Sequence, residues 1–241
     1  MEVKFPFFIA EIGNNHFGDF DKAKELIRLS KLSGATLAKL QAIDPDFAPR
    51  GSMPDGFYKA CTFTVDQYLE LIQYGESIGI PVFYSIFGED YKMARIKSTQ
   101  KFHKISASQS GAISQMSDPS WGPIDKAYTF VSINQTYLSD FNYTFSRSYL
   151  LYASDYMVDD PLLFKINDLR KITEKSIGYS DHTIGIKWAI ASIDLYGFQF
   201  LEKHFTDEKE KRWNGIVFRD TVHGATPEEF EKIVRFPVWG G

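Results

Sequence analysis

The stretch Gly178-Tyr-Ser-Asp-His-Thr-Ile-Gly185, together with Glu202-Lys-His-Phe-Thr206 further along the chain, decides the fold. Each stretch continues a short apolar run and then breaks into polar, ionisable residues, as a buried strand does where it reaches a rim. Between them, residues 186–195 carry apolar side chains at helical spacing, and Gly197 follows as a helix stop. A strand, a helix and a strand of this length predict a βα unit that feeds a parallel neighbour.

Two histidines fall where these strands end. Because chemistry in parallel α/β architectures collects at the carboxyl ends of strands, we expect His182 and His204 to lie side by side over the same rim. Asp181 and Glu202 accompany them in the sequence. Two imidazoles with nearby carboxylates suit a divalent metal of Mn or Zn character. The alternative is that each histidine is an ordinary surface or hydrogen-bonding residue, and their coincidence on adjacent strand ends favours the metal site.

The composition is that of a globular protein without a nucleic-acid-binding surface. The 241 residues match the roughly 250 that one α/β barrel needs. Hydrophobic residues make up 44% of the chain and charged residues 24%, both ordinary values that provide for a large core. The net charge is −4, with acids and bases interleaved and no basic run, which excludes a polyanion-binding surface.

The sequence also indicates in which cellular compartment the protein is expected. No apolar run approaches the roughly 18 residues of a membrane span, and the first residues show no signal-peptide pattern, so we expect a cytoplasmic protein that binds no membrane. The single cysteine, Cys61, excludes an internal disulfide and fits a reducing compartment. Cys61 is either an inert apolar residue or a nucleophile, and the lack of a histidine or acid near it in the sequence favours the first.

Taken in order, short apolar runs alternate with helical segments along the whole chain. Asp19 or Asp21 caps an early helix that ends at Gly34, and Thr64 with Gln67 forms a capping box at the start of another. Further helices are expected near residues 91–96, at 162–173 and after Thr226, with a long loop over 42–63. Besides the two organising strands, we expect strands at residues 7–12, 36–41, 81–86, 102–107, 128–133 and 149–154. Eight βα repeats over residues 1–241 favour a closed (β/α)8 TIM barrel in one domain over an open doubly wound sheet.

Polar residues recur where nearly every strand stops, and in a barrel all of them face one mouth. Lys39, Lys104 and Lys203, with several hydroxyls, make an anion site suited to a small phosphorylated acid. A metal would act as a Lewis acid, and Glu11 or Glu202 as a general acid or base. The full ring consists of Glu11, Lys39, Gln41, Ser85, Lys104, Ser106, Ser132, Ser154, Asp155, Ser180 to His182 and Glu202 to His204.

At these residues the sequence resembles the N-acetylneuraminate (sialic acid) synthase family, and the similarity spans essentially the whole chain. The resemblance implies a (β/α)8 barrel that condenses phosphoenolpyruvate with an N-acetylhexosamine aldehyde, releases phosphate and makes a nonulosonic 2-keto acid. The segments that carry it are Ala10-Glu-Ile-Gly-Asn-Asn-His-Phe-Gly18, Ala38-Lys-Leu-Gln41, Lys104-Ile-Ser106, residues 178–185 and residues 202–206.

By matching position, the resemblance implies that His182 and His204 are ligands of Mn or Mg, which polarises the sugar aldehyde. Glu11 would assist proton movement near the new bond, and Glu202 would orient the sugar. Asp220 falls at the family's acidic position between the last strand and helix, after an insertion. The residues expected to bind substrate are Lys39, Gln41, Lys104, Ser132, Asp155, Ser180 and Lys203, with Lys104 also counted among the catalytic residues.

The chain departs from the family at the phosphoenolpyruvate end of the site. Ala107 stands for a phosphate-binding serine, Gln109 for a glutamate, Asp155 for an asparagine and Met157 for a substrate-binding tyrosine. A carboxylate at 155 opposes an anionic substrate unless a lysine or the metal intervenes. The family's C-terminal antifreeze-like domain, which brings an arginine into the partner subunit's site, is absent from this sequence, and a homodimer is the default expectation.

These observations favour a minimal nonulosonate synthase. Two alternatives stay open, since one barrel hosts many chemistries. The first is a metal-dependent sugar lyase or aldolase that uses no phosphoenolpyruvate. The second is a non-catalytic relative that binds a sugar or a true synthase subunit. The metal identity among Mn, Mg, Co and Zn, and the acceptor sugar, stay open as well.

Overall fold

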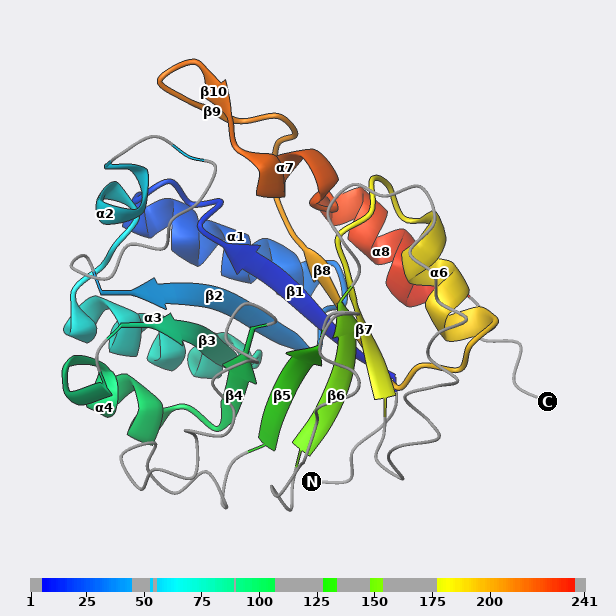
Figure 1. The fold of residues 1–241 in the computed structure, drawn as a ribbon, viewed down its shortest axis with the longest axis horizontal. Helices are drawn as coiled ribbons and strands as arrows, with labels where there is room; N and C mark the ends of the chain where they lie inside the picture. Colours follow the sequence, from blue (N-terminus) through cyan, green and yellow to red (C-terminus); the bar gives the residue numbers. More distant parts are fainter. Residues whose placement is uncertain are drawn as a thin grey trace.

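The fold is a closed barrel of eight parallel strands, as expected from the sequence (Figure 1). The computed structural model describes residues 6–44, 53, 56–88, 90–106, 128–133, 148–153 and 177–236. Each strand pairs in parallel with the next along the chain, and β8 closes the barrel on β1. The strands are β1 (Phe7–Gly13), β2 (Leu37–Ile43), β3 (Val82–Phe87), β4 (Phe102–Ile105), β5 (Tyr128–Ile133), β6 (Ser148–Ala153), β7 (Ile177–Asp181) and β8 (Phe200–His204).

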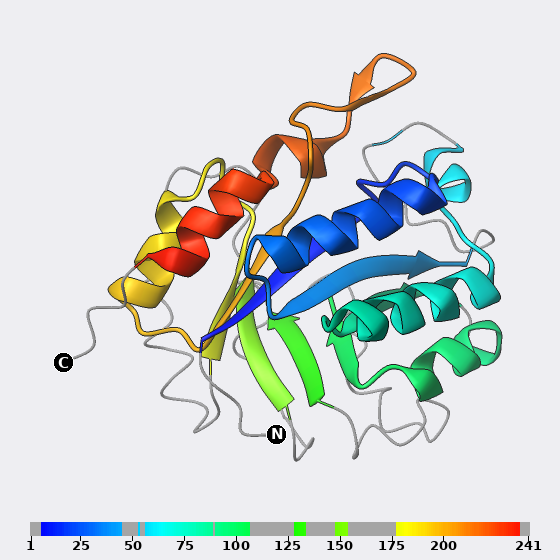
Figure 2. The ribbon, with the colours of Figure 1, turned by 180° about the vertical axis from the view of Figure 1, so that it is seen from behind.

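Helices lie on the outside of the barrel, as Figure 2 shows for α1 (Phe20–Leu32), α3 (Val65–Ile78) and α8 (Pro227–Arg235). Their starts follow the expected capping residues. Asp19, rather than Asp21, is the N-cap of α1, and its side chain accepts a hydrogen bond from the backbone of Lys22. Among the helices that the structure describes, none combines the length and the apolar composition that crossing a membrane requires.

The remaining described helices are α2 (Phe57–Ala60), α4 (Asp90–Thr99), α6 (Lys187–Asp194) and α7 (Arg219–His223). Sequence reasoning predicted α6 and α4 but neither α2 nor α7. It also missed a short antiparallel hairpin of β9 (Arg212–Trp213) and β10 (Ile216–Val217). Figure 1 shows this hairpin and α7 beyond the carboxyl end of β8.

The inside of the barrel is divided into an apolar layer and a polar layer. The apolar layer, here called the floor, is a buried cluster of Phe7, Ile9, Leu37, Phe83, Phe102, Phe130 and Phe200. Because side chains on a strand alternate between faces, the residue two positions after a floor residue also points inward. Those next inward residues are Glu11, Lys39, Ser85, Lys104, Ser132 and Glu202, all of them buried. The sequence pattern therefore places ionisable groups directly above the floor, toward the carboxyl ends of the strands.

The other face of the strands packs against the helices. Ala10, Leu40 and Tyr84 belong to one large buried cluster that also contains Leu26 of α1 and Leu71 of α3. Burial of apolar surface between sheet and helices is the main stabilising contribution in such a fold. Apolar packing between strands and helices thus stabilises the barrel from outside. The upper inner layer can therefore be polar without the loss of this contribution.

Gly178 on β7 permits a close approach of β8, and we expect Gly178→Ala to destabilise the protein. A Cβ at this position would lie 2.5 Å from both Cβ and the carbonyl oxygen of Phe200, a fully buried floor residue that pairs with Gly178 in register. Because neither atom belongs to a flexible side-chain end, relief requires a backbone shift, which costs roughly 1–3 kcal/mol. Urea denaturation should show a lower midpoint with an unchanged slope. An unchanged midpoint would contradict the tight packing of these strands.

Candidate active site

Four buried charges lie together above the floor and are here called the four-charge cluster: Glu11, Lys39, Lys104 and Glu202. The ammonium of Lys104 lies 2.6 Å from Glu202 Oε1. Lys39 forms an ion pair with Glu11 and lies 3.5 Å from Glu202 Oε2. Buried charges are tolerated when each is paired, as here. The cluster comes from β1, β2, β4 and β8, so barrel closure itself brings these residues together.

Hydroxyl and amide groups surround the four-charge cluster. Lys39 Nζ donates to Ser85 Oγ at 3.1 Å, and Ser180 Oγ donates to Glu202 Oε1 at 2.8 Å. Asn14 Nδ2 donates to Gln41 Oε1 at 2.5 Å. Ser132 Oγ is buried and has no hydrogen-bond partner within the described part of the chain. The Glu202 carboxylate is therefore held by a lysine and a serine, whereas Ser132 keeps its hydrogen-bonding capacity.

The two carboxyl groups of the cluster have pKa values displaced in opposite directions. Burial raises the pKa of Glu11 to about 7, although Lys39 opposes this shift. For Glu202, burial acts in the same upward direction, but Lys104 and Lys39 together lower the pKa to about 2. Burial also lowers the pKa of Lys104 to about 8. Two carboxyl groups with pKa values displaced in opposite directions are the pattern in which one can exchange a proton near neutral pH while the other stays ionised.

Three imidazoles and one carboxylate form a second group at the same rim, here called the histidine cluster: His182, His204, His223 and Asp220. The ring centre of His204 lies 5.5 Å from that of His182 and 4.8 Å from that of His223, and His182 and His223 are 5.8 Å apart. Asp220 Oδ2 lies 3.9 Å from His204 Nδ1. His182 and His204 thus lie close together at the rim, as expected from the sequence.

Sequence reasoning missed His223. It lies three residues after Asp220 in α7, so both side chains occupy one turn of the same helix. The sequence Arg219-Asp-Thr-Val-His223 contains the signal, but recognising it requires knowing that this segment is helical. Five residues are too few for an apolar periodicity to reveal a helix.

The ionisation of the histidine cluster suits metal coordination. Burial lowers the pKa of His182 to about 4 and that of His223 to about 2, and it lowers the pKa of His204 well below its usual value. Burial raises the pKa of Asp220 to about 6. The imidazoles are therefore neutral at pH 7, the form that binds a metal.

The donor atoms of these residues would suit a divalent metal ion. His204 Nδ1 is buried and has no hydrogen-bond partner among the described residues. Gly13 lies next to it in a left-handed conformation (φ 55°), and a Cβ there would be 3.1 Å from Glu11 Oε1 and 3.8 Å from His204 Nδ1. The absence of a side chain thus keeps space open between a carboxylate and an imidazole. Nitrogen and carboxylate donors around such a space are a donor set for a divalent transition metal.

Lys203 is not brought to the four-charge cluster. It stands between Glu202 and His204 on β8, so its side chain points to the opposite face of the strand. Its ammonium lies 3.0 Å from Asp181 Oδ2 and donates to the carbonyl oxygen of Thr183 at 2.8 Å, with both charged side chains fully buried. The other oxygen of Asp181 accepts hydrogen bonds from the backbone N–H and the hydroxyl of Thr183. Lys203 therefore fixes the turn that carries His182.

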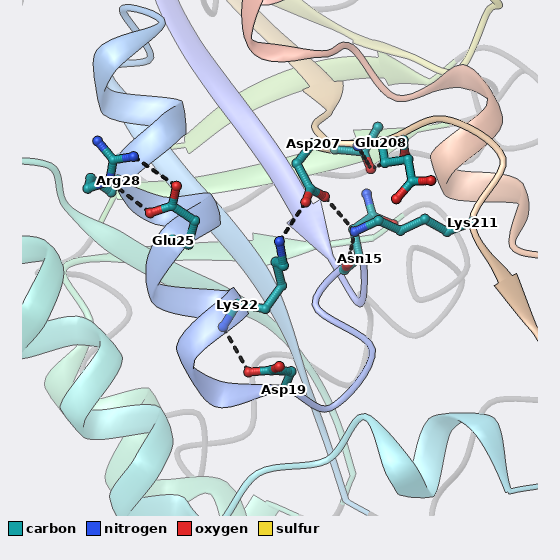
Figure 3. Close-up of polar contacts among 9 residues, drawn as sticks. Asn15, Asp19, Lys22, Glu25, Arg28, Asp207, Glu208 and Lys211 are labelled. Carbon is teal, nitrogen blue, oxygen red and sulfur yellow. Dashed lines mark hydrogen bonds and ion pairs between the residues drawn. The ribbon is translucent and has the colours of Figure 1, made fainter.

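Contacts between loops position the end of β8, where His204 lies. Asn15 Nδ2 donates to the carbonyl oxygen of Phe205 at 2.7 Å. Asp207 pairs with Lys22 at 2.7 Å and with Lys211 at 2.5 Å, and Lys211 also donates to the Asn15 carbonyl at 3.3 Å (Figure 3). These bonds tie the turn after β1 to the chain after β8, so the rim has a fixed shape around the histidine cluster.

The candidate substrate residue Asp155 and the departures Ala107, Gln109 and Met157 lie outside the described residues, as does the helix expected at 162–173. Buried Cys61 belongs to a small apolar cluster with Met53, Phe57 and Phe218, and burial raises the pKa of its thiol to about 12. This agrees with an inert apolar cysteine.

The fold and the site define a TIM-barrel enzyme whose ionisable residues gather at the carboxyl ends of the strands. A sequence model of the NeuB family matches residues 150–236. An uncharacterized protein of Methanocaldococcus jannaschii is 30% identical over 95% of this chain and 68% of its own length. Human N-acetylneuraminate-9-phosphate synthase is 28% identical over the same shares. The chain belongs to the NeuB family.

A solved structure shows the same fold: the N-acetylneuraminic acid synthetase of Leptospira borgpetersenii, with a TM-score of 0.79 at 24% identity over 96% of this chain and 82% of that one. The family that the sequence motifs indicated is therefore confirmed. The expected enzyme class, a carbon–carbon bond-forming transferase of sugar-acid biosynthesis, is confirmed with it.

Proposed function

We propose that this protein condenses phosphoenolpyruvate with an N-acetylhexosamine-type aldose and releases phosphate, which gives a nonulosonic 2-keto acid. The observation that carries the proposal is the juxtaposition of two buried lysines, Lys39 and Lys104, with a cluster of metal-competent imidazoles at one barrel mouth. Together with the family membership, this arrangement offers a binding site for an anion beside a binding site for a divalent metal.

The two lysines would bind the anionic substrate. Lys39 and Lys104 would contact its carboxylate and phosphate, and Ser132 and Ser180 would add hydrogen bonds. In the ligand-free protein the lysines pair with Glu11 and Glu202, so an anion must share or displace these carboxylates. Protonation of Glu11, whose pKa burial raises to about 7, removes one competing charge. This makes Glu11 part of the binding step as well.

The reaction balances without a further co-reactant. The enol carbon bonds to the aldehyde carbon, whose oxygen takes up a proton. Water then adds, with loss of a proton, at the carbon that bears the phosphate oxygen, and the tetrahedral species expels phosphate to leave the keto group. The histidine cluster would hold Mn or Mg, which when bound supplies a Lewis acid for the aldehyde oxygen. Catalysis requires that the lysines bind the tetrahedral species more tightly than the substrate.

The acidic residues would divide the proton transfers. Glu11, whose pKa burial raises to about 7, can hold or release a proton near neutral pH, and Asp220, whose pKa burial raises to about 6, can do so while no metal is bonded to its carboxylate. Glu202 stays ionised and would orient the sugar hydroxyls. Gln41 lies at the same rim as a hydrogen-bonding residue, and Lys203 would act as a positioning residue through Asp181 and Thr183.

One observation favours the second candidate, a metal-dependent sugar lyase or aldolase without phosphoenolpyruvate. Lys39 and Lys104 are already neutralised by two carboxylates, which an enzyme of that kind would not need to displace. Asp155, which lies outside the described residues, would oppose an anion in the same way. The two candidates differ in whether the protein binds phosphoenolpyruvate at all.

The test is a calorimetric titration of phosphoenolpyruvate into Mn-loaded protein, followed by a phosphate-release assay with N-acetylmannosamine. We expect saturable binding that Lys39→Met weakens by at least about 100-fold, because loss of a buried charged contact costs about 3 kcal/mol. Lys24→Met, which removes a partly exposed lysine from α1, should bind as the wild type does. Folded, Mn-loaded protein that binds no phosphoenolpyruvate would contradict the synthase proposal and support the lyase.

A further inference from the structure

We propose that His223 is a metal ligand, so that His204, Asp220 and His223 form a site of two imidazoles and one carboxylate. Neither the sequence motifs nor the similar proteins assign a role to this histidine. The inference rests on the proposed function, because it concerns the same metal. Binding of that metal can, however, be measured without any substrate.

The distances place these three side chains around one point. One donor atom from each of His204, Asp220 and His223 can be chosen so that all three lie within 4.8 Å of one another. The Asp220 carboxylate is 3.9 Å from His204 Nδ1, and the rings of His204 and His223 are nearly perpendicular, at 86°. Since metal–donor bonds are about 2.1 Å long, donors on one ion lie at most about 4.2 Å apart. Small side-chain rotations therefore suffice to bring all three into contact with an ion.

The backbone around α7 holds Asp220 and His223 in front of His204. Both residues lie in one helical turn, and the chain after them returns to the end of β8. There the Ala225 N–H donates to the His204 carbonyl at 2.6 Å, and the Thr206 N–H donates to the Ala225 carbonyl at 3.0 Å. The segment that directly follows the helix with two of the donors is thus bonded to the end of the strand that carries the third. A site built on such fixed elements is the kind that binds a metal with defined geometry.

His182 does not take part in this set equally. Its ring centre is farther from those of His204 and His223 than these two are from each other, and its side chain is only partly buried. His204, Asp220 and His223 are all buried, and Gly13 leaves space beside His204 Nδ1. We therefore assign His182 the role of a fourth donor rather than that of one of the three ligands.

The donor types determine which metals the site prefers. Two imidazole nitrogens and one carboxylate suit Mn, Fe, Co, Ni or Zn, whereas Mg prefers oxygen ligands and retains its water. The Asp220 carboxylate also adds one negative charge to neutral imidazoles, which a divalent cation offsets. The site should therefore retain Co or Mn against an excess of Mg.

The experiment is a titration of the metal-free protein with Co alone, followed by its visible absorption, with no substrate present. We expect His223→Ala to weaken Co binding by at least about 100-fold, since even loss of a supporting contact to a ligand costs 10–100-fold. Asp220→Asn should weaken it as well, and His182→Ala by less. The variant His223→Cys should bind Co and show the thiolate-to-cobalt absorption band that only a directly bonded sulfur gives. Circular dichroism of each metal-free variant checks that it folds.

The outcomes separate this inference from the proposed function. If His223→Ala binds Co as tightly as the wild type while His182→Ala does not bind, the metal is held by His182 and His204 and the inference is wrong. If His223→Cys binds Co without the thiolate band, position 223 is not a ligand. In either case, binding of phosphoenolpyruvate and phosphate release would still support the synthase, so the two ideas fail independently.

Discussion

Replacing Lys104 by methionine is expected to lower the free energy of unfolding by about 3 kcal/mol and to lower kcat/KM by roughly three orders of magnitude. The first effect arises because Lys104 lies 2.6 Å from Glu202 in a buried pair, and its removal leaves the Glu202 carboxylate with the more distant Lys39, 3.5 Å away, as its remaining cation in the cluster. The second arises because the proposed anion site loses one of its two cations, which in a site shielded from water stabilises the developing charge strongly. Methionine preserves the length of the side chain, so packing changes little.

The double variant Lys104→Met with Glu202→Gln separates these two effects. Removing both charges also removes the unpaired carboxylate, so the unfolding free energy should recover most of the loss. Activity should not recover, because the site then lacks both the Lys104 ammonium and the Glu202 carboxylate. Chemical denaturation of the four proteins of this cycle and a phosphate-release assay provide the measurements. If Lys104→Met alone is as stable as the wild type, the ion pair between Lys104 and Glu202 does not contribute to the stability of the fold.

Glu11 is expected to make the stability of the metal-free protein fall as the pH rises from about 4.5 to about 7. Burial raises the pKa of its carboxyl to about 7 in the folded state, above the 4.5 of the unfolded chain. In this window the folded state holds a proton that the unfolded state has lost, so each rise in pH favours unfolding. The full shift corresponds to about 3 kcal/mol. Below about 4.5 both states are protonated and the contribution is constant.

The variant Glu11→Gln isolates this contribution, since glutamine resembles the protonated carboxyl. Other buried groups titrate in the same range, so the quantity to measure is the difference in unfolding free energy between wild type and variant from pH 4 to pH 8. That difference should grow with pH in favour of the variant, while its activity falls by roughly 10²–10³-fold because no proton carrier remains. A difference that stays constant over the whole range would mean that the pKa of Glu11 in the folded protein equals its value in the unfolded chain.

The fold could be predicted because the inward positions of the strands repeat one simple pattern. Phe83 and Ser85, or Phe102 and Lys104, each pair an apolar floor residue with a polar residue two positions later. A capping box predicted the start of α3 at Thr64, and the last helix, α8, begins after Thr226 as expected. Helices α2 and α7 and the hairpin of β9 and β10 were missed, because segments of two to five residues are too short for a periodicity.

The positions of those candidate residues that lie at strand ends could be predicted from the sequence. Glu11, Lys39, Lys104, Glu202, His182 and His204 do lie at one mouth, since parallel strands deliver their last residues to the same rim. The ion pairs between them could not be read from the sequence, because they depend on which strands meet across the barrel. The same two-residue alternation that turns Glu202 and His204 inward places Lys203 on the other face, beside Asp181. His223 depends on a helix that only the tertiary structure defines.

The floor of the barrel bears on the order in which substrates bind and products are released. Phe83, Phe130 and Phe200, each at most 1% exposed, fill the barrel beneath Lys104 and Glu202. A small molecule therefore reaches these two side chains from the rim, and whatever binds second closes the path behind it. Under the proposed function, we therefore expect ordered turnover, in which the substrate that binds deepest binds first and the product held at that depth leaves last. Phosphate or keto acid held against the lysines would then compete with the first substrate alone.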